Sequence, residues 1–104
     1  DGWLVSVDGA GNRTGAMTFG PRKVIVVAGA NKICADLDAA WERLRATACP
    51  LNMKRLGMPN PCTQTGRCTD CRTPTRGCRI YTVLKRKPLL TDLTVVIVGE
   101  ELGF

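Results

Sequence analysis

Four cysteines lie within seventeen residues of this chain, in the segment PCTQTGRCTDCRTPTRGC. Cys62, Cys68, Cys71 and Cys78 are separated by five, two and six residues, and the chain contains no histidine. A Cys-x-x-Cys pair lets two thiolates bind one ion from a single tight turn, and the two outer cysteines can complete the site. Interleaved prolines and glycines let the backbone direct N–H groups at the sulfurs. The pattern therefore predicts a soft-metal site made of four thiolates.

Two other uses of the cysteines compete with a metal. Disulfides suit six cysteines in a small secreted protein, but no signal sequence is in view. A redox-active dithiol needs its pair at the N-terminus of a helix, and the residues around Cys68 and Cys71 do not resemble a helix start. A bound zinc ion or iron–sulfur cluster is the favoured interpretation, and the spacing does not separate the two. Cys34 and Cys49 flank a predicted helix and are interpreted as small buried hydrophobic residues.

Positive charge is concentrated around the cysteines. The segment from Leu51 to Pro88 carries nine basic residues and one acid, Asp70, while the net charge of the whole chain is +6. Cations at this place offset the negative charge of a thiolate cluster. Tyr81 is the one aromatic residue near the cysteines, so the stacking surface of an RNA-binding ribbon is missing and no nucleic-acid partner is predicted. No apolar run reaches the roughly 18 to 20 residues of a membrane span, and we expect a soluble chain.

Strand and helix patterns alternate before the cysteine segment. Residues 3–7 and 14–19 flank a loop rich in glycine and asparagine, which predicts a β-hairpin. The continuous β-branched run 23–29 predicts a strand buried on both faces of a mainly parallel sheet. Apolar residues at helical spacing predict a flanking helix over 35–48 that ends before Pro50.

Strand patterns return after the cysteines, over residues 80–84 and 93–99. Strand, helix and strand then form a crossover connection, into which residues 51–79 are inserted. A long insertion without secondary structure of its own is either functional or stapled, and a metal held by four thiols would be the staple. At 104 residues the chain fits a single α/β domain over 1–104.

Two groups of polar residues could hold a small anion. Asn31 and Lys32 follow the second predicted strand at its carboxyl end, where open α/β sheets bind ligands. Asp8, Asn12 and Arg13 lie at the tip of the predicted hairpin, where backbone N–H groups and a guanidinium can meet an anion. The same three residues also suit a plain turn. Histidine is absent and serine occurs once, so no catalytic residue is predicted.

Five strings follow one another in a recognisable order: VDGAGNR, GPRKVIVVAGANKI, PLNMKRLG, PCTQTGRCTDC and TVVIVGEELGF. Together they resemble the C-terminal half of the lactate-utilisation (LUD) domain family, in its cysteine-bearing branch. The resemblance covers nearly the whole chain. It implies a three-layer α/β fold of the ribose-5-phosphate isomerase and CoA-transferase-like type, a cytoplasmic location, and a link to the oxidation of L-lactate alongside iron–sulfur subunits. The family's N-terminal half is missing from the sequence, so we expect any site shared between the halves to be incomplete.

Three functions are compatible with these features, and the sequence does not decide whether the chain is an enzyme. The first is a component of lactate oxidation whose cysteines hold an iron–sulfur cluster or another metal, working with iron–sulfur redox subunits. The second is a non-catalytic module in which a structural zinc orders the basic insertion for docking to an acidic partner. The third, suggested by fold analogy alone, is a transferase or isomerase for a phosphorylated or CoA-linked substrate. A small anionic ligand and self-association into a homo-oligomer are further expectations.

Overall fold

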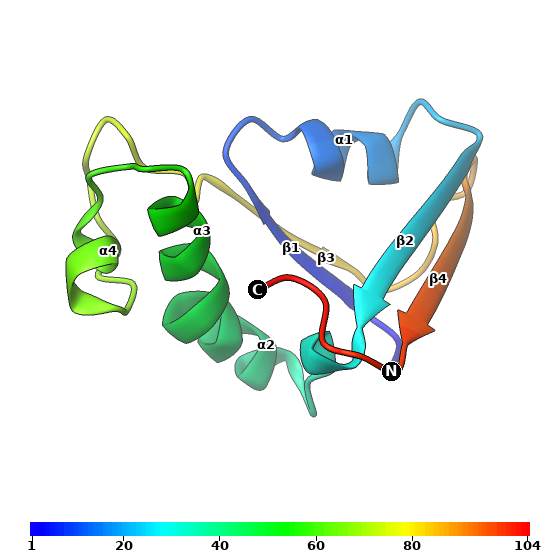
Figure 1. Cartoon of the computed structure of the whole chain (residues 1–104). Coiled ribbons are helices and arrows are strands. Elements are labelled where there is room, and N and C mark those ends of the chain that lie inside the picture. Colours follow the sequence, from blue (N-terminus) through cyan, green and yellow to red (C-terminus); the bar gives the residue numbers. More distant parts are fainter. The chain divides into compact units, whose positions relative to one another are not determined.

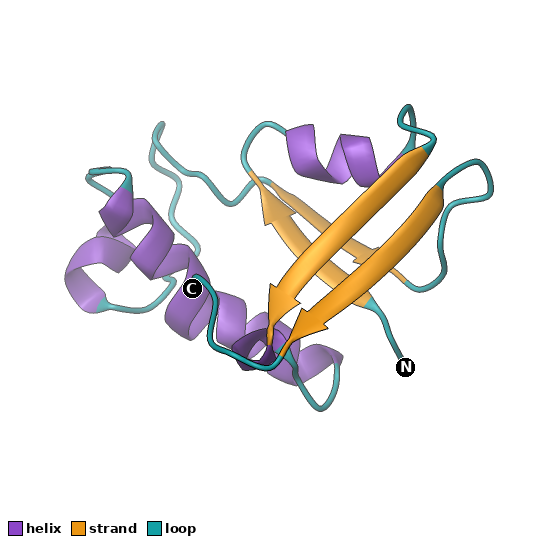
Figure 2. Ribbon diagram, turned by 45° about the vertical axis from the view of Figure 1, so that its right-hand side comes forward, coloured by secondary structure: helices purple, strands orange, loops and turns teal.

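The computed structural model describes residues 1–104, which form two compact units. One unit comprises residues 1–33 with 80–103, and the other comprises residues 34–79 with residue 104. All four strands belong to the first unit, and the cysteine segment with its helices belongs to the second (Figures 1 and 2). The α/β class is confirmed, whereas the single domain over 1–104 stays a prediction. None of the helices combines the length and the apolar character that crossing a membrane requires.

Strands β2 (Lys23–Gly29) and β4 (Asp92–Val98) pair in parallel along their whole length (Figure 1). A parallel pair needs a crossover connection, because a tight turn cannot join strands that run the same way. The predicted strand over 23–29 and its crossover are confirmed. Burial of that strand on both faces is wrong for this chain, since Ile25 and Val27 are 58% and 60% exposed. A sheet of only two strands leaves this face uncovered.

Strands β1 (Leu4–Asp8) and β3 (Ile80–Leu84) form a second sheet, which is antiparallel. Figure 2 shows both two-stranded sheets as separate pairs of arrows. The chain therefore contributes one parallel and one antiparallel pair in place of a mainly parallel sheet. The three-layer fold implied by the family resemblance extends beyond these two sheets and stays a prediction.

The predicted β-hairpin is wrong, because its second arm is helix α1 (Asn12–Thr18). Gly11 adopts the left-handed conformation with a φ of 81° and turns the chain into the helix. The Asp8 carboxylate then accepts the backbone N–H of Thr14 at 2.7 Å, which satisfies one of the unpaired donors of the first helical turn. The first strand pairs instead with β3, a partner that is distant in sequence and that no local turn signal reveals.

The second unit begins with a continuous helical segment. It consists of α2 (Leu37–Arg43), the π-helical turn η2 (Leu44–Ala48) and α3 (Cys49–Arg55). The predicted helix is confirmed over most of its range, but its predicted end before Pro50 is wrong. The backbone N–H of Cys49 donates to the Leu44 carbonyl, five residues back, so Pro50 enters within the first turn of α3, where its missing N–H is tolerated.

The insertion over residues 51–79 is less irregular than predicted. It includes most of α3 and the short helix α4 (Pro61–Thr65), which ends at Gly66 with a φ of 75°. Residues 66–79 form neither helix nor strand. Three of the four motif cysteines lie in this irregular stretch, so their positions depend on side-chain and loop contacts rather than on regular hydrogen bonding.

Gly29, the last residue of β2, lies directly against neighbouring backbone. A Cβ at this position would stand 2.6 Å from the Glu100 carbonyl oxygen and 2.6 Å from the Leu102 nitrogen. Backbone cannot turn aside as a side chain can, so Gly29→Ala should lower the free energy of unfolding by about 1–3 kcal/mol in urea denaturation. The matched control is Gly15→Ala in α1, where a Cβ would meet nothing within 4 Å outside the helix's own backbone and alanine is the better helix former. Equal losses from both substitutions would contradict the close approach at Gly29.

Candidate metal centre

Five of the six cysteines of the second unit line one small cavity of about 20 Å³. Its lining includes all four cysteines of the motif together with a fifth, Cys49. The other lining residues are Met53, Asn60, Thr69, Arg76 and Gly77. The structure thus brings the four predicted ligands to one place, and their role in binding a metal stays a prediction. Cys49, interpreted from the sequence as a small buried hydrophobic residue, is half-buried and lines the same cavity as the motif cysteines, and its role stays a prediction.

Cys68 is held by the irregular turn of the long helix. In the π-helical spacing of η2 the next donor to the Arg45 carbonyl would be residue 50, but Pro50 has no N–H. The backbone N–H of Cys68 donates to this carbonyl instead, at 2.9 Å. Beside it, the Arg67 guanidinium makes two hydrogen bonds to the Glu42 carboxylate of α2, at 2.5 and 2.8 Å. The chain entering the Cys-x-x-Cys turn is therefore fixed to the helix at two adjacent residues.

The Cys-x-x-Cys turn directs hydrogen-bond donors at its sulfurs. The backbone N–H of Asp70 donates to Cys68 Sγ at 3.3 Å, and the Thr73 hydroxyl donates to Cys71 Sγ at 3.6 Å. Asp70 has a φ of 52° and is the one residue other than glycine in the left-handed region. That conformation is strained for a residue with a Cβ, and it persists where the surrounding structure holds the turn in place.

Arg76 fixes the second half of the loop. Its guanidinium donates to the carbonyls of Cys71 and Cys78, both at 2.7 Å, and pairs with the Asp70 carboxylate at 2.7 Å. The Arg76 side chain is only 23% exposed. One side chain therefore ties the backbone of two predicted ligands and places a positive charge at the lining of the cavity. In the sequence it is one basic residue among nine in this segment, and no local pattern distinguishes it.

Two further contacts fasten the loop to the helices. Asn60 is buried, accepts the Thr75 hydroxyl at 2.7 Å through Oδ1 and donates to the Thr75 carbonyl at 3.3 Å through Nδ2. Met53 of α3 reaches the loop at Gly77, where a Cβ would stand 2.6 Å from Met53 Cε. The loop that carries the cysteines is thus joined to the start of α4 and lies directly on α3.

The cysteines differ in how readily they ionise. The pKa of Cys78 is lowered to about 7 because it accepts a hydrogen bond from the Cys49 thiol; burial opposes this, and the Arg76 guanidinium adds to it. The same hydrogen bond, with burial and the charge of nearby sulfurs, raises the pKa of Cys49 well above its usual range. Burial, followed by the charge of Cys78, raises the pKa of Cys62. Of these three thiols, Cys78 is the one most readily ionised.

As the side chains stand, no three cysteine or acidic groups converge closely enough to hold a metal ion. Rotation about χ1 moves a cysteine sulfur without moving the backbone. The donor set fits a soft metal: thiols surround one cavity, an N–H group and a hydroxyl point at sulfur, and a guanidinium balances charge. The cavity has room for a single ion.

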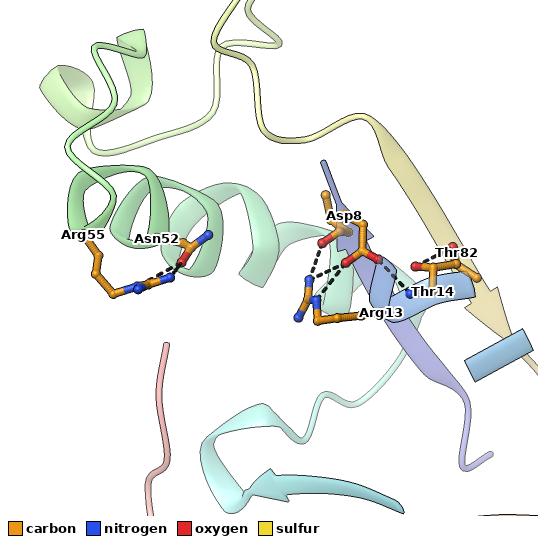
Figure 3. Close-up of polar contacts among 7 residues, drawn as sticks. Asp8, Arg13, Thr14, Asn52, Arg55 and Thr82 are labelled. Carbon is orange, nitrogen blue, oxygen red and sulfur yellow. Dashed lines mark hydrogen bonds and ion pairs between the residues drawn. The ribbon is translucent and has the colours of Figure 1, made fainter. Parts of the chain in front are cut away.

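Much of the positive charge around the cysteines is bonded within the second unit. Arg55 donates to the Asn52 side chain at 2.8 Å (Figure 3), and Arg79 donates to the carbonyls of Arg76 and Pro74 at 2.8 and 2.9 Å. Together with the contacts of Arg67 and Arg76, four arginines of this segment serve its own structure. They do so in addition to any role in offsetting thiolate charge.

The first predicted anion site follows β2. Asn31 and Lys32 belong to the 3-10 turn η1 (Ala30–Lys32). The Asn31 amide nitrogen donates to the Gly103 carbonyl at 3.2 Å, and its oxygen accepts the Leu102 N–H at 3.1 Å. Asn31 therefore holds the segment that follows β4 through both of its polar groups. A role for Asn31 and Lys32 in binding an anion stays a prediction.

The second predicted anion site lies at the start of α1 (Figure 3). The Asp8 side chain is 1% exposed, and its carboxylate accepts Nε of Arg13 at 2.8 Å as well as the N–H of Thr14. Arg13 also donates to the Val7 carbonyl at 2.7 Å, and Asn12 is the first residue of the helix. The guanidinium thus has a carboxylate of the same chain as its partner. Anion binding by Asp8, Asn12 and Arg13 stays a prediction.

Asp8 makes stability depend on pH in the acid range. Burial opposes ionisation, but the N–H and hydroxyl of Thr14 and the Arg13 guanidinium outweigh it, so the pKa of Asp8 is lowered. A lowered pKa adds stability that is present above the unfolded value of about 4 and is lost as pH falls below it. Asp8→Asn should therefore cost about 1–3 kcal/mol at neutral pH in urea denaturation, and the gap to wild type should close as pH falls below about 4. Asp38→Asn, an exposed charge change, should cost less than about 1 kcal/mol.

A family model of the LUD domain matches residues 1–98 of the chain. No curated protein and no solved structure gives a significant match. The matched range contains all four strands, every cysteine of the cavity and both predicted anion sites. The chain therefore belongs to the LUD domain family.

Proposed function

We propose that this chain is a lactate-utilisation domain that binds a metal through Cys62, Cys68, Cys71 and Cys78. The observation that carries the proposal is the gathering of these cysteines around one cavity, with donors aimed at two of the sulfurs and a guanidinium at the lining. Buried cysteines that serve only as small hydrophobic residues need no such donors. Membership of the LUD family supports the link to lactate utilisation.

A single zinc ion is the metal that the geometry supports best. The cavity of about 20 Å³ matches one ion, and zinc takes four sulfurs in a tetrahedron at about 2.3 Å. A zinc ion bound in this way would supply structural order to residues ~60 to 80. An iron–sulfur cluster is the second candidate, because the same four thiolates could hold one and electron transfer would suit lactate oxidation. A cluster is larger than one ion, so the loop would have to open to admit it.

The class of partner protein depends on which metal is bound. With a cluster, the domain would exchange electrons with iron–sulfur redox subunits in the cytoplasm. With zinc, it would be a structural module, and the exposed Lys54 and Arg72 would be available to an acidic partner.

The test is metal analysis of protein purified without oxygen. One zinc per chain and no colour would support the structural centre, whereas iron with broad thiolate-to-iron absorption in the visible range would support the cluster. Cys34→Ser is the matched control, because Cys34 does not line the cavity and its replacement should leave the metal content unchanged. Finding neither metal, under conditions in which zinc and iron are supplied, would overturn the proposal.

A further inference from the structure

Met53 contributes the only sulfur of the cavity lining that does not belong to a cysteine. It lies in α3, four residues after Cys49, and residues at this spacing share one face of a helix. Both residues line the cavity, and Met53 is only 6% exposed. The face of α3 that borders the cavity therefore carries a buried thioether as well as a thiol.

Gly77 lets the end of the Met53 side chain reach the cysteine loop. A Cβ at Gly77 would stand 2.6 Å from Met53 Cε and 2.9 Å from Met53 Sδ, so the thioether lies directly against the backbone of the loop. Gly77 is not among the glycines with a positive φ, so its φ does not require glycine. The close approach of Met53 does require it. Because Cys78 follows Gly77 and also lines the cavity, the thioether lies beside the backbone of a predicted ligand.

A thioether is a ligand for copper(I) but adds nothing to a zinc site. Zinc sites in proteins are built from thiolates, imidazoles and carboxylates. Copper(I) is a softer ion, and thiolate and thioether ligands select it. Methionine also fills irregular gaps in cores, and leucine can replace it where packing alone is needed. A change that removes the sulfur and keeps the volume therefore separates a ligand from a packing residue.

We propose that Met53 Sδ is a ligand for copper(I) in this cavity, together with thiolates of the cysteines that line it, and that it sets a preference for copper(I) over zinc. The inference rests on the proposed function, because the cysteines must bind a metal before a thioether can add to the site. It goes further by assigning a ligand outside the cysteine motif. It also names an ion that the spacing of the cysteines does not indicate.

Met53→Leu tests the role of the sulfur. The affinities of the full chain for copper(I) and for zinc are measured separately, without oxygen and with a reductant, by competition with a chromophoric chelator for each ion. Loss of this one sulfur should lower copper(I) affinity by about 10- to 100-fold, the range seen when one supporting group of a metal site is removed, and leave zinc affinity unchanged. The matched control is Met58→Leu, because Met58 lies in the same unit and does not line the cavity. It should change neither affinity.

Unchanged copper(I) affinity in Met53→Leu would overturn the inference, and so would an equal fall for both ions, which is the mark of a packing residue. Selenium absorption gives a direct readout with residue 53 intact. In a selenomethionine protein carrying Met17→Leu and Met58→Leu, position 53 holds the only selenium, and its X-ray absorption should show a copper neighbour once copper(I) is added. A selenium atom without that neighbour would exclude the ligand role. A wild-type chain that binds neither ion would overturn the proposed function, and this inference with it.

Discussion

Replacing Cys68 and Cys71 together by serine should abolish metal binding. A structural zinc site contributes about 10–16 kcal/mol through four ligands, or about 3 kcal/mol for each thiolate. Two lost thiolates therefore correspond to a fall of about 10⁴-fold in affinity, since each 1.4 kcal/mol is about a tenfold change. Competition with a chromophoric chelator measures this affinity. Serine keeps the size of the side chain, so the change removes the ligand atoms without opening a large void.

Loss of the metal in the double serine variant should also make the cysteine loop less ordered. Hydrogen exchange of residues ~60 to 80 should accelerate as one group in the double variant, because binding and folding of a small metal site are coupled. The β2–β4 pair should exchange as in wild type, since its hydrogen bonds do not involve the loop. Cys34→Ser again serves as the control. Retention of one metal per chain with both thiolates replaced would contradict the four-thiolate site.

Arg76→Ala should loosen the cysteine loop nearly as much as replacing Cys68 and Cys71 by serine, although it removes no sulfur. The change leaves the carbonyls of Cys71 and Cys78 without the donor that now lies 2.7 Å from each. Hydrogen bonds from a charged donor contribute about 1.5–3 kcal/mol apiece, and two that share one side chain are not additive, so we expect a loss of about 2–4 kcal/mol. The ion pair with Asp70 adds little, because that carboxylate is 85% exposed.

The matched control for Arg76 is Arg72→Ala in the same loop. Arg72 is exposed and takes part in none of the hydrogen bonds or ion pairs of the structure, so its loss removes the same charge without the same contacts. Exchange rates of residues ~60 to 80, with and without zinc, separate the two roles. If both alanine variants loosen the loop equally, Arg76 acts through its charge and not through the carbonyls that it bonds.

The part of the cysteine site that depends on residue type and spacing could be predicted from the sequence. Four thiols with a Cys-x-x-Cys pair predict convergence, and they line one cavity. Cys49 and Arg76 could not be predicted in the same way. Cys49 reaches the cavity because the helix continues through Pro50, and Arg76 matters because of two carbonyls that only the folded loop presents. Both depend on tertiary contacts that no local pattern encodes.

Among the strands, too, some features follow from the local sequence and others depend on tertiary contacts. The run of β-branched residues over 23–29 is a local property of the sequence, and it correctly predicts strand β2. The hairpin was not, because a glycine-rich loop is equally compatible with a helix start once Asp8 accepts the Thr14 N–H. The partner of β1 lies at Ile80–Leu84, and pairing over such a distance is decided by packing rather than by turn residues.

The hydrogen bond from Cys68 to the Arg45 carbonyl has a consequence for the entropy of metal binding. Closing a flexible loop loses entropy that increases with loop length. Because Cys68 is already tied back to the helix, the chain between α3 and Cys78 is divided into two shorter loops before any ion arrives. Part of the ordering is thereby completed when the helix folds, and an ion has fewer conformations to exclude. A helix that continues through a proline thereby leaves a carbonyl that holds the cysteine loop.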